Sequence, residues 1–216
     1  MKYEHIFFDL DGTLTDPALG ITNAIIYARK KWGLDPGKNE DYYKFIGPPM
    51  PKSYETYWGF TPEQAKQFLA DYREHYSVIG LFENQPYPGM AEMLEKLKAV
   101  GCKLYVATSK PTDMSVKILE KFDLAKYFEI ISGSDPNQPD STKADVIRHA
   151  QKACGIDMTY AVMVGDRSYD VLGARECGIG CVGAGYGYGS FEELTGAGAE
   201  YVADTVEALG TYLLTP

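Results

Sequence analysis

Apolar and polar positions follow two different patterns along the chain. From about residue 83 onward, short runs rich in Val, Ile and Ala alternate with segments whose apolar residues recur every three or four positions. Such runs predict buried strands, and the recurring spacing predicts amphipathic helices. One more run of the strand type, Ile6-Phe7-Phe8, lies near the N-terminus. Strands alternating with helices predict an α/β fold whose parallel sheet is covered on both faces.

Turn residues and helix-capping signals delimit these elements. The expected strands are Ile6–Phe8, Cys102–Ala107, Phe128–Ile131, Ala161–Val164, Gly180–Ala184 and Tyr201–Ala203. Pro111 is expected to begin the helix after the second strand, and Ser190-Phe191-Glu192-Glu193 has the spacing of a capping box. The stretch from Gly183 to Gly189 is rich in Gly and Tyr but too short to indicate disorder.

The stretch after the first strand shows helical periodicity only. Asp16 and Pro17 are expected to be the N-cap and first residue of its first helix. Thr61-Pro62-Glu63-Gln64 has capping-box spacing and begins another helix. We therefore predict a core made of residues 1–15 and 83–216, into which an all-helical domain of residues 16–82 is inserted.

Composition narrows the class of protein. The 216 residues suffice for one core with a small second unit, and 45% hydrophobic with 24% charged residues is typical of a soluble globular protein. The formal charge of −9 argues against nucleic acid or an anionic membrane as partner. The apolar runs are too short to span a membrane, and no basic segment leads into a long apolar stretch, so no signal peptide is expected.

The cysteines indicate the redox environment. Cys102, Cys154, Cys177 and Cys181 include no Cys-x-x-Cys pair, and each lies in or beside an apolar segment. We expect buried free thiols in a reducing cytoplasm, and this spacing argues against a zinc site.

Candidate chemistry begins at the end of the first strand. Residues two apart on a strand point to the same side, so Asp9 and Asp11 present two carboxylates at one place. Such a pair is costly unless a cation or a shared proton relieves the repulsion. Gly12 and Thr13 then open a turn. The alternative interpretation is an ordinary capped turn, for which Asp and Gly are common residues.

Two further groups of polar residues follow strand ends, where open parallel sheets bind ligands. They are Thr108 with Ser109, and Asp166 with Asp170, while Lys143 lies near the start of the helix after the third strand. An oxygen-rich group of carboxylates suits magnesium. Asp166 and Asp170 would share a helix face if their helix began early. Taken singly, Asp170 and Lys143 would be exposed helix residues, and Thr108 a strand-end cap.

The order of these motifs resembles the haloacid dehalogenase superfamily of phosphotransferases. Asp9-Leu10-Asp11-Gly12-Thr13 matches its first motif, Thr108 the second, Lys143 the third, and residues 165–170 the fourth. Lys110 competes for the third motif, because Ala144 follows Lys143 where the family often has proline. The helical insertion resembles the cap of the phosphoglycolate-phosphatase-like branch. Ile46-Gly47-Pro48-Pro49-Met50 with Ser53 resembles that branch's cap segment and also its 5'-nucleotidase-like members.

The resemblance implies a Rossmann-like core and a role for each motif residue. Asp9 would be the nucleophile that forms an aspartyl-phosphate, and Asp11 the general acid and base. Lys143 would neutralise negative charge on Asp9 and phosphate. Mg²⁺ would be held by Asp9, the main-chain carbonyl of Asp11 and Asp166, with Asp170 in support.

Phosphate and substrate contacts are implied in the same way. Thr108 and Ser109 would hydrogen-bond the phosphoryl oxygens, and Gly12 and Thr13 belong to the same phosphate-binding group. In the inserted domain, we expect Lys44 and the Gly47–Met50 segment to face the substrate, although an exposed lysine and an ordinary turn would explain them equally well. Arg29, Lys52 and Arg73 are the other candidate cations of that domain.

The favoured function is a magnesium-dependent phosphatase of small phosphomonoesters, either phosphoglycolate or nucleoside monophosphates. A sugar-phosphate mutase would use the same nucleophile and acid–base pair. Outside the enzymes, a signalling receiver domain also combines clustered aspartates with Thr and Lys, but the helical insertion and Gly-Asp-x-x-x-Asp argue against it. A binding protein that keeps the fold without catalysis is the fourth alternative. The sequence predicts no oligomeric state.

Overall fold

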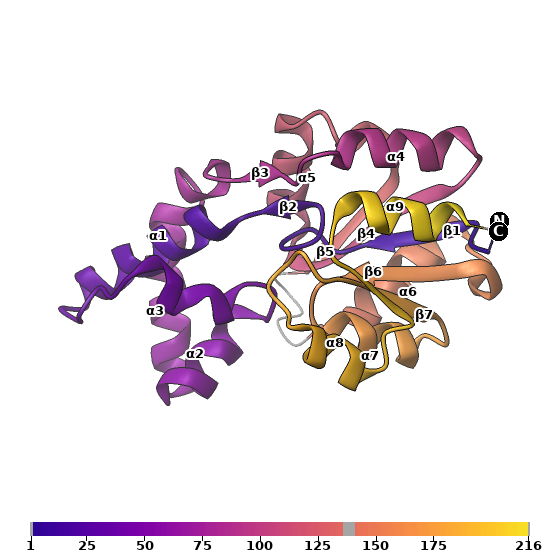
Figure 1. Cartoon of the computed structure of the whole chain (residues 1–216). Coiled ribbons are helices and arrows are strands. Elements are labelled where there is room, and N and C mark those ends of the chain that lie inside the picture. Colours follow the sequence, from indigo (N-terminus) through magenta and orange to yellow (C-terminus); the bar gives the residue numbers. More distant parts are fainter. Residues whose placement is uncertain (1, 136–140, 216) are drawn as a thin grey trace. The chain divides into compact units, whose positions relative to one another are not determined.

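The computed structural model describes residues 2–135 and 141–215. The chain forms two compact units (Figure 1). The larger unit comprises Met1–Asp16 and Pro86–Pro216, and the smaller one comprises Pro17–Gln85. We predicted a division after residues 15 and 82, and the two units divide after residues 16 and 85.

A six-stranded sheet is the centre of the larger unit, with the order β5-β4-β1-β6-β7-β8 and every neighbouring pair parallel. Its strands are β1 (His5–Phe8), β4 (Lys103–Pro111), β5 (Phe128–Ser134), β6 (Ala161–Gly165), β7 (Gly180–Ala184) and β8 (Tyr201–Ala203). The parallel α/β fold expected from the sequence is confirmed. Because β1 lies between β4 and β6, the residues that follow Phe8 leave from the middle of the sheet.

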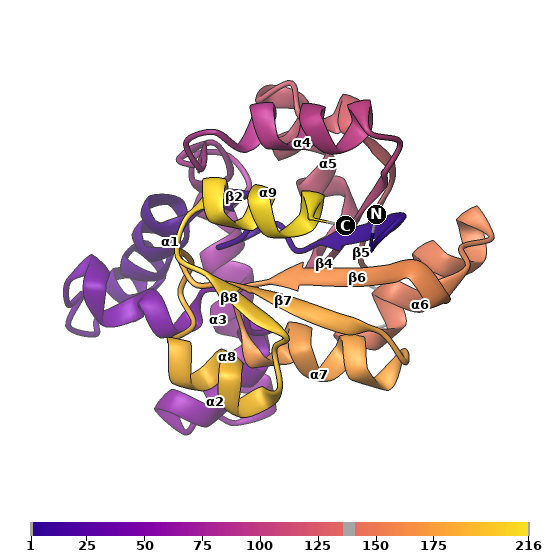
Figure 2. The same cartoon turned by 45° about the vertical axis from the view of Figure 1, so that its right-hand side comes forward.

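Helices cover both faces of this sheet. They are α4 (Met90–Ala99), α5 (Thr112–Lys121), α6 (Lys143–Cys154), α7 (Ser168–Glu176), α8 (Phe191–Ala197) and α9 (Val206–Leu214), with short 3-10 turns η3 (Ala125–Tyr127) and η4 (Met158–Tyr160). Figure 2 shows α4 and α9 on one face and α7 and α8 on the other. On the latter side, Phe7 and Met163 pack with Ile147, Val171 and Leu194 in one buried cluster. Each such side chain contributes roughly 1.5–3 kcal/mol when fully buried.

Strand β4 is longer than the sequence predicted. We expected a strand that ends at Ala107 and a helix that begins at Pro111, but β4 continues through Pro111. The extension forms because β5 also continues, so that Pro111 pairs with Ser134 after a register shift. Helix α5 begins one residue later, at Thr112, and Pro111 is its N-cap.

The smaller unit is built from helices. They are α1 (Ala18–Lys31), η1 (Asn39–Phe45), α2 (Met50–Trp58), α3 (Pro62–Tyr76) and η2 (Gly80–Phe82). The predicted capping box is present: Thr61 Oγ1 accepts the Gln64 N–H at 3.2 Å, and Gln64 Oε1 accepts the Thr61 N–H at 2.9 Å. The interior is aromatic, with Tyr54 stacked on Trp58 at a centroid distance of 5.2 Å and Phe45 at 4.6 Å from Trp58.

The prediction for Asp16 was wrong. Asp16 belongs to a short strand, β2 (Thr15–Asp16), which pairs with β3 (Gln85–Pro86). Pro17 occupies the N-cap position of α1 and forms no side-chain cap hydrogen bond. The carboxylate of Asp16 accepts a hydrogen bond from the Tyr188 hydroxyl, which is 172 residues away in sequence. Asp16 therefore contacts a residue that local spacing could not predict.

Two further expectations concern the cysteines and membranes. Cys102 and Cys181 are buried and Cys177 is partly buried, but Cys154 is exposed, contrary to prediction. Helical spacing from Ala150 suggested burial, yet Cys154 is the last residue of α6, in a terminal turn that is open to solvent. Within the described ranges, all four thiols are free, and none of the helices has the length and apolar character needed to cross a bilayer.

Candidate active site

The turn after β1 holds the first two aspartates. The Asp9 N–H donates to Val164 O at 2.9 Å, so Asp9 continues the pairing of β1 with β6. Both Asp9 and Asp11 are buried. Gly12 has φ +82°, and a Cβ there would lie 2.2 Å from Asp166 Oδ2. Backbone conformation and available space thus both require glycine at this position.

Lys143 is the lysine that contacts Asp9. It is the first residue of α6, whose N-terminus is fixed by a reciprocal capping box between Thr142 and Asp145. Its Nζ lies 3.0 Å from Asp9 Oδ1 and 2.8 Å from Asp170 Oδ1, and donates to Ala107 O at 3.0 Å. Lys143 therefore lies in contact with Asp9, as its match to the third motif leads us to expect, and its role stays a prediction.

Lys110 contacts the other aspartate of the first motif. Its Nζ lies 2.6 Å from Asp11 Oδ2, and both side chains are buried. Thr108 and Lys110 both lie on β4, and the Thr108 hydroxyl accepts the Lys110 N–H at 3.3 Å. Ser109 lies between them and is half-buried. The sequence offered Lys110 only as an alternative to Lys143, whereas the structure places both lysines among the aspartates.

The segment from Gly165 to Asp170, here called the aspartate loop, supplies the remaining carboxylates. Asp166 is fully buried, and its Oδ2 accepts the Tyr188 N–H at 2.9 Å. Asp170 Oδ2 accepts the Arg167 N–H at 3.0 Å, leaving Oδ1 for Lys143. Helix α7 begins at Ser168, so Asp166 precedes it. The early helix start under which Asp166 and Asp170 would share a helix face is therefore not found; Asp166 lies before the helix and Asp170 in its first turn.

Burial and charge control the protonation of these groups. Burial raises the pKa of Asp166 well above its ordinary value, and the neighbouring Asp170 and Asp9 raise it further. Burial also raises the pKa of Asp170, against the opposing effect of Lys143. Burial by itself would lower the pKa of Lys143. The negative charges of Asp170 and Asp9 outweigh this effect, so the net pKa is raised and the lysine stays cationic. Burial likewise raises the pKa of Asp11, which Lys110 opposes.

The donor set fits a divalent cation. Asp9, Asp166 and Asp170 each offer a carboxylate oxygen, and these oxygens lie within 4.8 Å of one another. When ionised, the four aspartates carry two more charges than Lys110 and Lys143 neutralise. Hard cations such as Mg²⁺ prefer oxygen ligands of this kind. The Asp11 side chain faces Lys110 and is not in the group, so the predicted Asp11 contact would have to come from its main chain.

The other predicted site residues are placed less directly. Thr13 Oγ1 lies 3.5 Å from Asp166 Oδ1, at the limit of a hydrogen bond, and Thr13 O accepts the Tyr186 hydroxyl at 3.0 Å. Lys44 and Gly47 belong to the smaller unit, where Lys44 is exposed and its Nζ lies 4.9 Å from the centroid of the Tyr57 ring. Their contact with substrate stays a prediction.

Sequence reasoning missed the residues outside the motifs that hydrogen-bond to the aspartates and to the aspartate loop. Tyr188 contacts both Asp166 and Asp16, and Glu193 contacts Arg167 and Ser168. The only signal was the unusual Gly and Tyr content before residue 190. That composition says nothing about which distant loop the segment covers.

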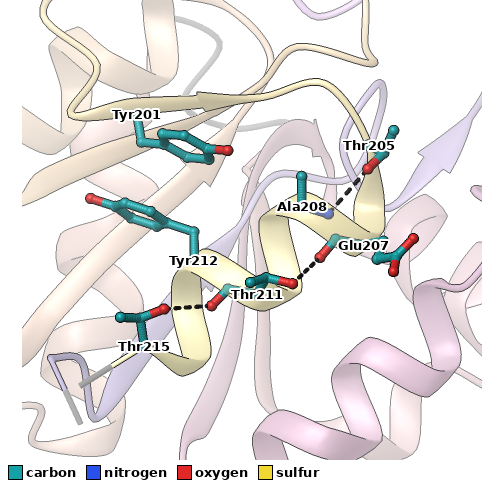
Figure 3. Close-up of a pocket in the computed structure, with 7 residues that line it drawn as sticks. All are labelled: Tyr201, Thr205, Glu207, Ala208, Thr211, Tyr212 and Thr215. Atoms are coloured by element: carbon teal, nitrogen blue, oxygen red, sulfur yellow. Dashed lines mark hydrogen bonds between the residues drawn. The ribbon is translucent and has the colours of Figure 1, made fainter.

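A separate hollow lies over β8 and α9 and involves none of these residues (Figure 3). It is lined by Tyr201, Thr205, Glu207, Ala208, Thr211, Tyr212 and Thr215. The two tyrosine rings stack on each other at 4.4 Å, and the hydroxyls of Thr205, Thr211 and Thr215 bond to the backbone of α9. Glu207 supplies the one carboxylate of this lining, so the cluster of buried aspartates is the better candidate for chemistry.

Comparisons with known proteins agree with this geometry. The model of the haloacid dehalogenase-like hydrolase family matches residues 6–184. The chain is similar to a 5'-nucleotidase of Pseudomonas aeruginosa, with 40% identity over 90% of this chain and 88% of the relative. It is also similar to a phosphoglycolate phosphatase of Caulobacter vibrioides, with 33% identity over 85% of this chain and 79% of the relative.

Similarity extends to solved structures. The crystal structure of a predicted phosphatase from Clostridium acetobutylicum superposes with a TM-score of 0.95 and 43% identity, covering 98% of each chain. The family match spans both the turn after β1 and the aspartate loop, the two segments that supply the four buried aspartates Asp9, Asp11, Asp166 and Asp170. The chain therefore belongs to the haloacid dehalogenase-like hydrolase family.

Proposed function

We propose that the chain is a Mg²⁺-dependent phosphatase of small phosphomonoesters that acts through a phosphorylated Asp9. The observation that carries the proposal is the setting of Asp9. It is buried at the end of the central strand, with Lys143 Nζ 3.0 Å from Oδ1 and two further carboxylates within 4.8 Å. The names of the relatives support phosphate ester hydrolysis.

The residues can carry out the reaction in two balanced steps. An Asp9 carboxylate oxygen bonds to phosphorus while the bond from phosphorus to the ester oxygen breaks, and the departing oxygen takes a proton from Asp11. In the second step, the oxygen of water bonds to phosphorus while the bond from phosphorus to the Asp9 oxygen breaks, and the water gives a proton to Asp11. This step releases phosphate and restores the Asp9 carboxylate. Lys143 offsets negative charge on Asp9 throughout.

Asp9, Asp166 and the main chain of Asp11 would hold the magnesium ion. When bound, the ion supplies positive charge that stabilises the phosphoryl oxygens. Asp170 supports the group indirectly, because one of its oxygens contacts Lys143 and the other accepts the Arg167 N–H. Thr108, Ser109, Gly12 and Thr13 are the proposed phosphate contacts.

The names of the relatives support the proposed substrate class. Phosphoglycolate and nucleoside monophosphates are both proposed, since relatives of comparable coverage are named for each. We propose that the smaller unit is a cap that selects among them, with Lys44 and Gly47 contacting substrate. The free thiols are consistent with the proposed cytoplasmic location. A sugar-phosphate mutase is the alternative enzyme.

Phosphate release from p-nitrophenyl phosphate and from a panel of phosphorylated metabolites tests the proposal. We expect chelation to abolish release and added Mg²⁺ to restore it. Asp9→Asn should lose all turnover, because an amide cannot form the acyl phosphate. Asp113→Asn, an exposed position on α5, is the matched control and should behave as the wild type. Full activity in excess chelator, or turnover by Asp9→Asn, would contradict the proposed mechanism.

A further inference from the structure

The segment from Gly185 to Gly189, here called the glycine–tyrosine segment, packs directly against Asp166. A Cβ on Gly187 would lie 2.4 Å from Asp166 Cβ, and one on Gly189 would lie 1.9 Å from the Asp166 carbonyl oxygen. Between these glycines, the Tyr188 N–H donates to Asp166 Oδ2 at 2.9 Å. Only residues without side chains allow the backbone to approach Asp166 this closely.

Glu193 follows this segment and contacts the aspartate loop at another point. The sequence predicted that Glu193 would complete a capping box with Ser190, but only half of it forms. Ser190 Oγ accepts the Glu193 N–H at 3.1 Å, whereas the Glu193 carboxylate turns to the aspartate loop. There Oε1 accepts Arg167 Nε–H at 3.0 Å, and both the Ser168 N–H and the Ser168 hydroxyl at 2.9 Å.

The charge state of Glu193 suits this role. Burial raises its pKa, but hydrogen bonds from Ser168 and the charge of Arg167 lower it more, so the pKa lies below its ordinary value. The carboxylate is therefore ionised at neutral pH and accepts three hydrogen bonds, one of them from a guanidinium. Hydrogen bonds to charged groups are stronger than those between neutral groups.

The contacts of Glu193 fall at the middle of the aspartate loop. Arg167 and Ser168 lie between Asp166 and Asp170, the two loop carboxylates in the candidate cation site. The Arg167 N–H also donates to Asp170 Oδ2 at 3.0 Å. A group that fixes Arg167 and Ser168 therefore fixes the separation of the two carboxylates.

We propose that Glu193 is a positioning residue for divalent-cation binding, which holds the aspartate loop in the conformation that brings Asp166 and Asp170 together. This inference rests on the proposed cation-dependent function but concerns a residue outside every motif of the site. Partners behind metal ligands typically change metal affinity by 10–100-fold. The glycine–tyrosine segment supports the same loop from the side of Asp166.

Titration of the full chain with Mn²⁺, without substrate, tests the proposal. Free Mn²⁺ is followed by electron paramagnetic resonance. We expect Glu193→Ala to weaken Mn²⁺ binding by about 10-fold or more. Glu193→Gln keeps an acceptor oxygen and should lose less. Glu192→Ala, on the exposed side of the same helical turn, is the matched control and should bind as the wild type. Wild-type affinity in Glu193→Ala would overturn the proposal.

Thermal unfolding separates positioning from a merely structural role. A structural role would lower Tm equally with and without cation. A positioning role should reduce the increase in Tm that saturating Mn²⁺ produces, because that increase reports affinity for the folded state. Equal increases in Tm for the wild type and both Glu193 variants would refute it.

Gly189→Ala tests whether the glycine–tyrosine segment supports the same loop, and Glu193→Gln replaces Glu193→Ala if that variant does not fold. The added methyl group would collide with the Asp166 carbonyl oxygen, so Mn²⁺ affinity should fall. Gly196→Ala, where nothing lies within 4 Å of the added Cβ, should bind as the wild type. If Gly189→Ala and Glu193→Gln both keep wild-type affinity, the inference is wrong.

The outcomes also separate this inference from the proposed function. Wild-type phosphatase activity with unchanged Mn²⁺ binding in the Glu193 variants would refute the inference alone. Mn²⁺ binding that depends on Glu193, in a chain that hydrolyses no phosphoester, would support the inference and refute the function. A wild type that binds no Mn²⁺ would refute both.

Discussion

Replacing Lys143 by methionine removes the cation that lies between two buried carboxylates. Its Nζ is 3.0 Å from Asp9 Oδ1 and 2.8 Å from Asp170 Oδ1, and all three side chains are at least 96% buried. Breaking one side of a buried ion pair typically costs about 3–5 kcal/mol. For a chain of this size, that corresponds to a decrease in Tm of roughly 6–20 °C.

The deficit should depend on pH with a definite sign. Burial raises the pKa of Asp170, and Lys143 opposes that effect, so the substitution should raise the pKa further. A carboxyl group whose folded-state pKa exceeds its unfolded value loses stability as pH rises through the folded-state pKa. The stability difference between Lys143→Met and the wild type should therefore be largest near pH 8 and shrink toward about pH 5.

Urea unfolding of both proteins at several pH values in chelator measures this difference. Lys152→Met, an exposed position on the same helix, is the matched control and should change stability by less than about 0.5 kcal/mol. The reasoning is refuted if Lys143→Met loses no more than this control does. It is also refuted if the deficit stays constant with pH.

Three further predictions concern single positions. Asp11→Asn should give a burst of nitrophenol from p-nitrophenyl phosphate and then slow turnover, because nitrophenolate leaves without a proton while water attack loses its base. Rapid quench and mapping of the phosphate should locate it on Asp9, and any other location contradicts the mechanism. Gly12→Ala should abolish Mn²⁺ binding in calorimetric titration, because its Cβ would lie 2.2 Å from Asp166 Oδ2, whereas Gly101→Ala, also at positive φ but in open space, should retain it. Thr61→Ala should lower the free energy of unfolding of the smaller unit by about 1 kcal/mol in urea, since the Gln64 N–H loses its cap; an unchanged midpoint would show that this cap contributes nothing.

Local signals in the sequence were sufficient for most of the fold. Apolar runs such as Ile6–Phe8 and Ala161–Val164 predicted strands because a strand buried on both faces needs consecutive apolar residues. The Thr61 capping box formed as predicted because its donors and acceptors lie within four residues. The parallel direction of the strands then followed from their alternation with helices. Because parallel strands end at one edge of the sheet, this arrangement brings together the strand ends that carry Asp9 and Asp166.

Where a polar side chain had both a local and a distant partner available, only the tertiary structure decided between them. Asp16 lies in β2 rather than at the N-cap and accepts the Tyr188 hydroxyl, and the Glu193 carboxylate contacts the aspartate loop rather than completing its predicted capping box. The sequence matched Lys143 to the third motif and offered Lys110 as a competitor, whereas their positions on α6 and β4 bring the two lysines to different aspartates. Spacing along the chain reports on neighbours within about one helical turn, whereas these partners are 25–172 residues apart and meet only after the sheet has formed.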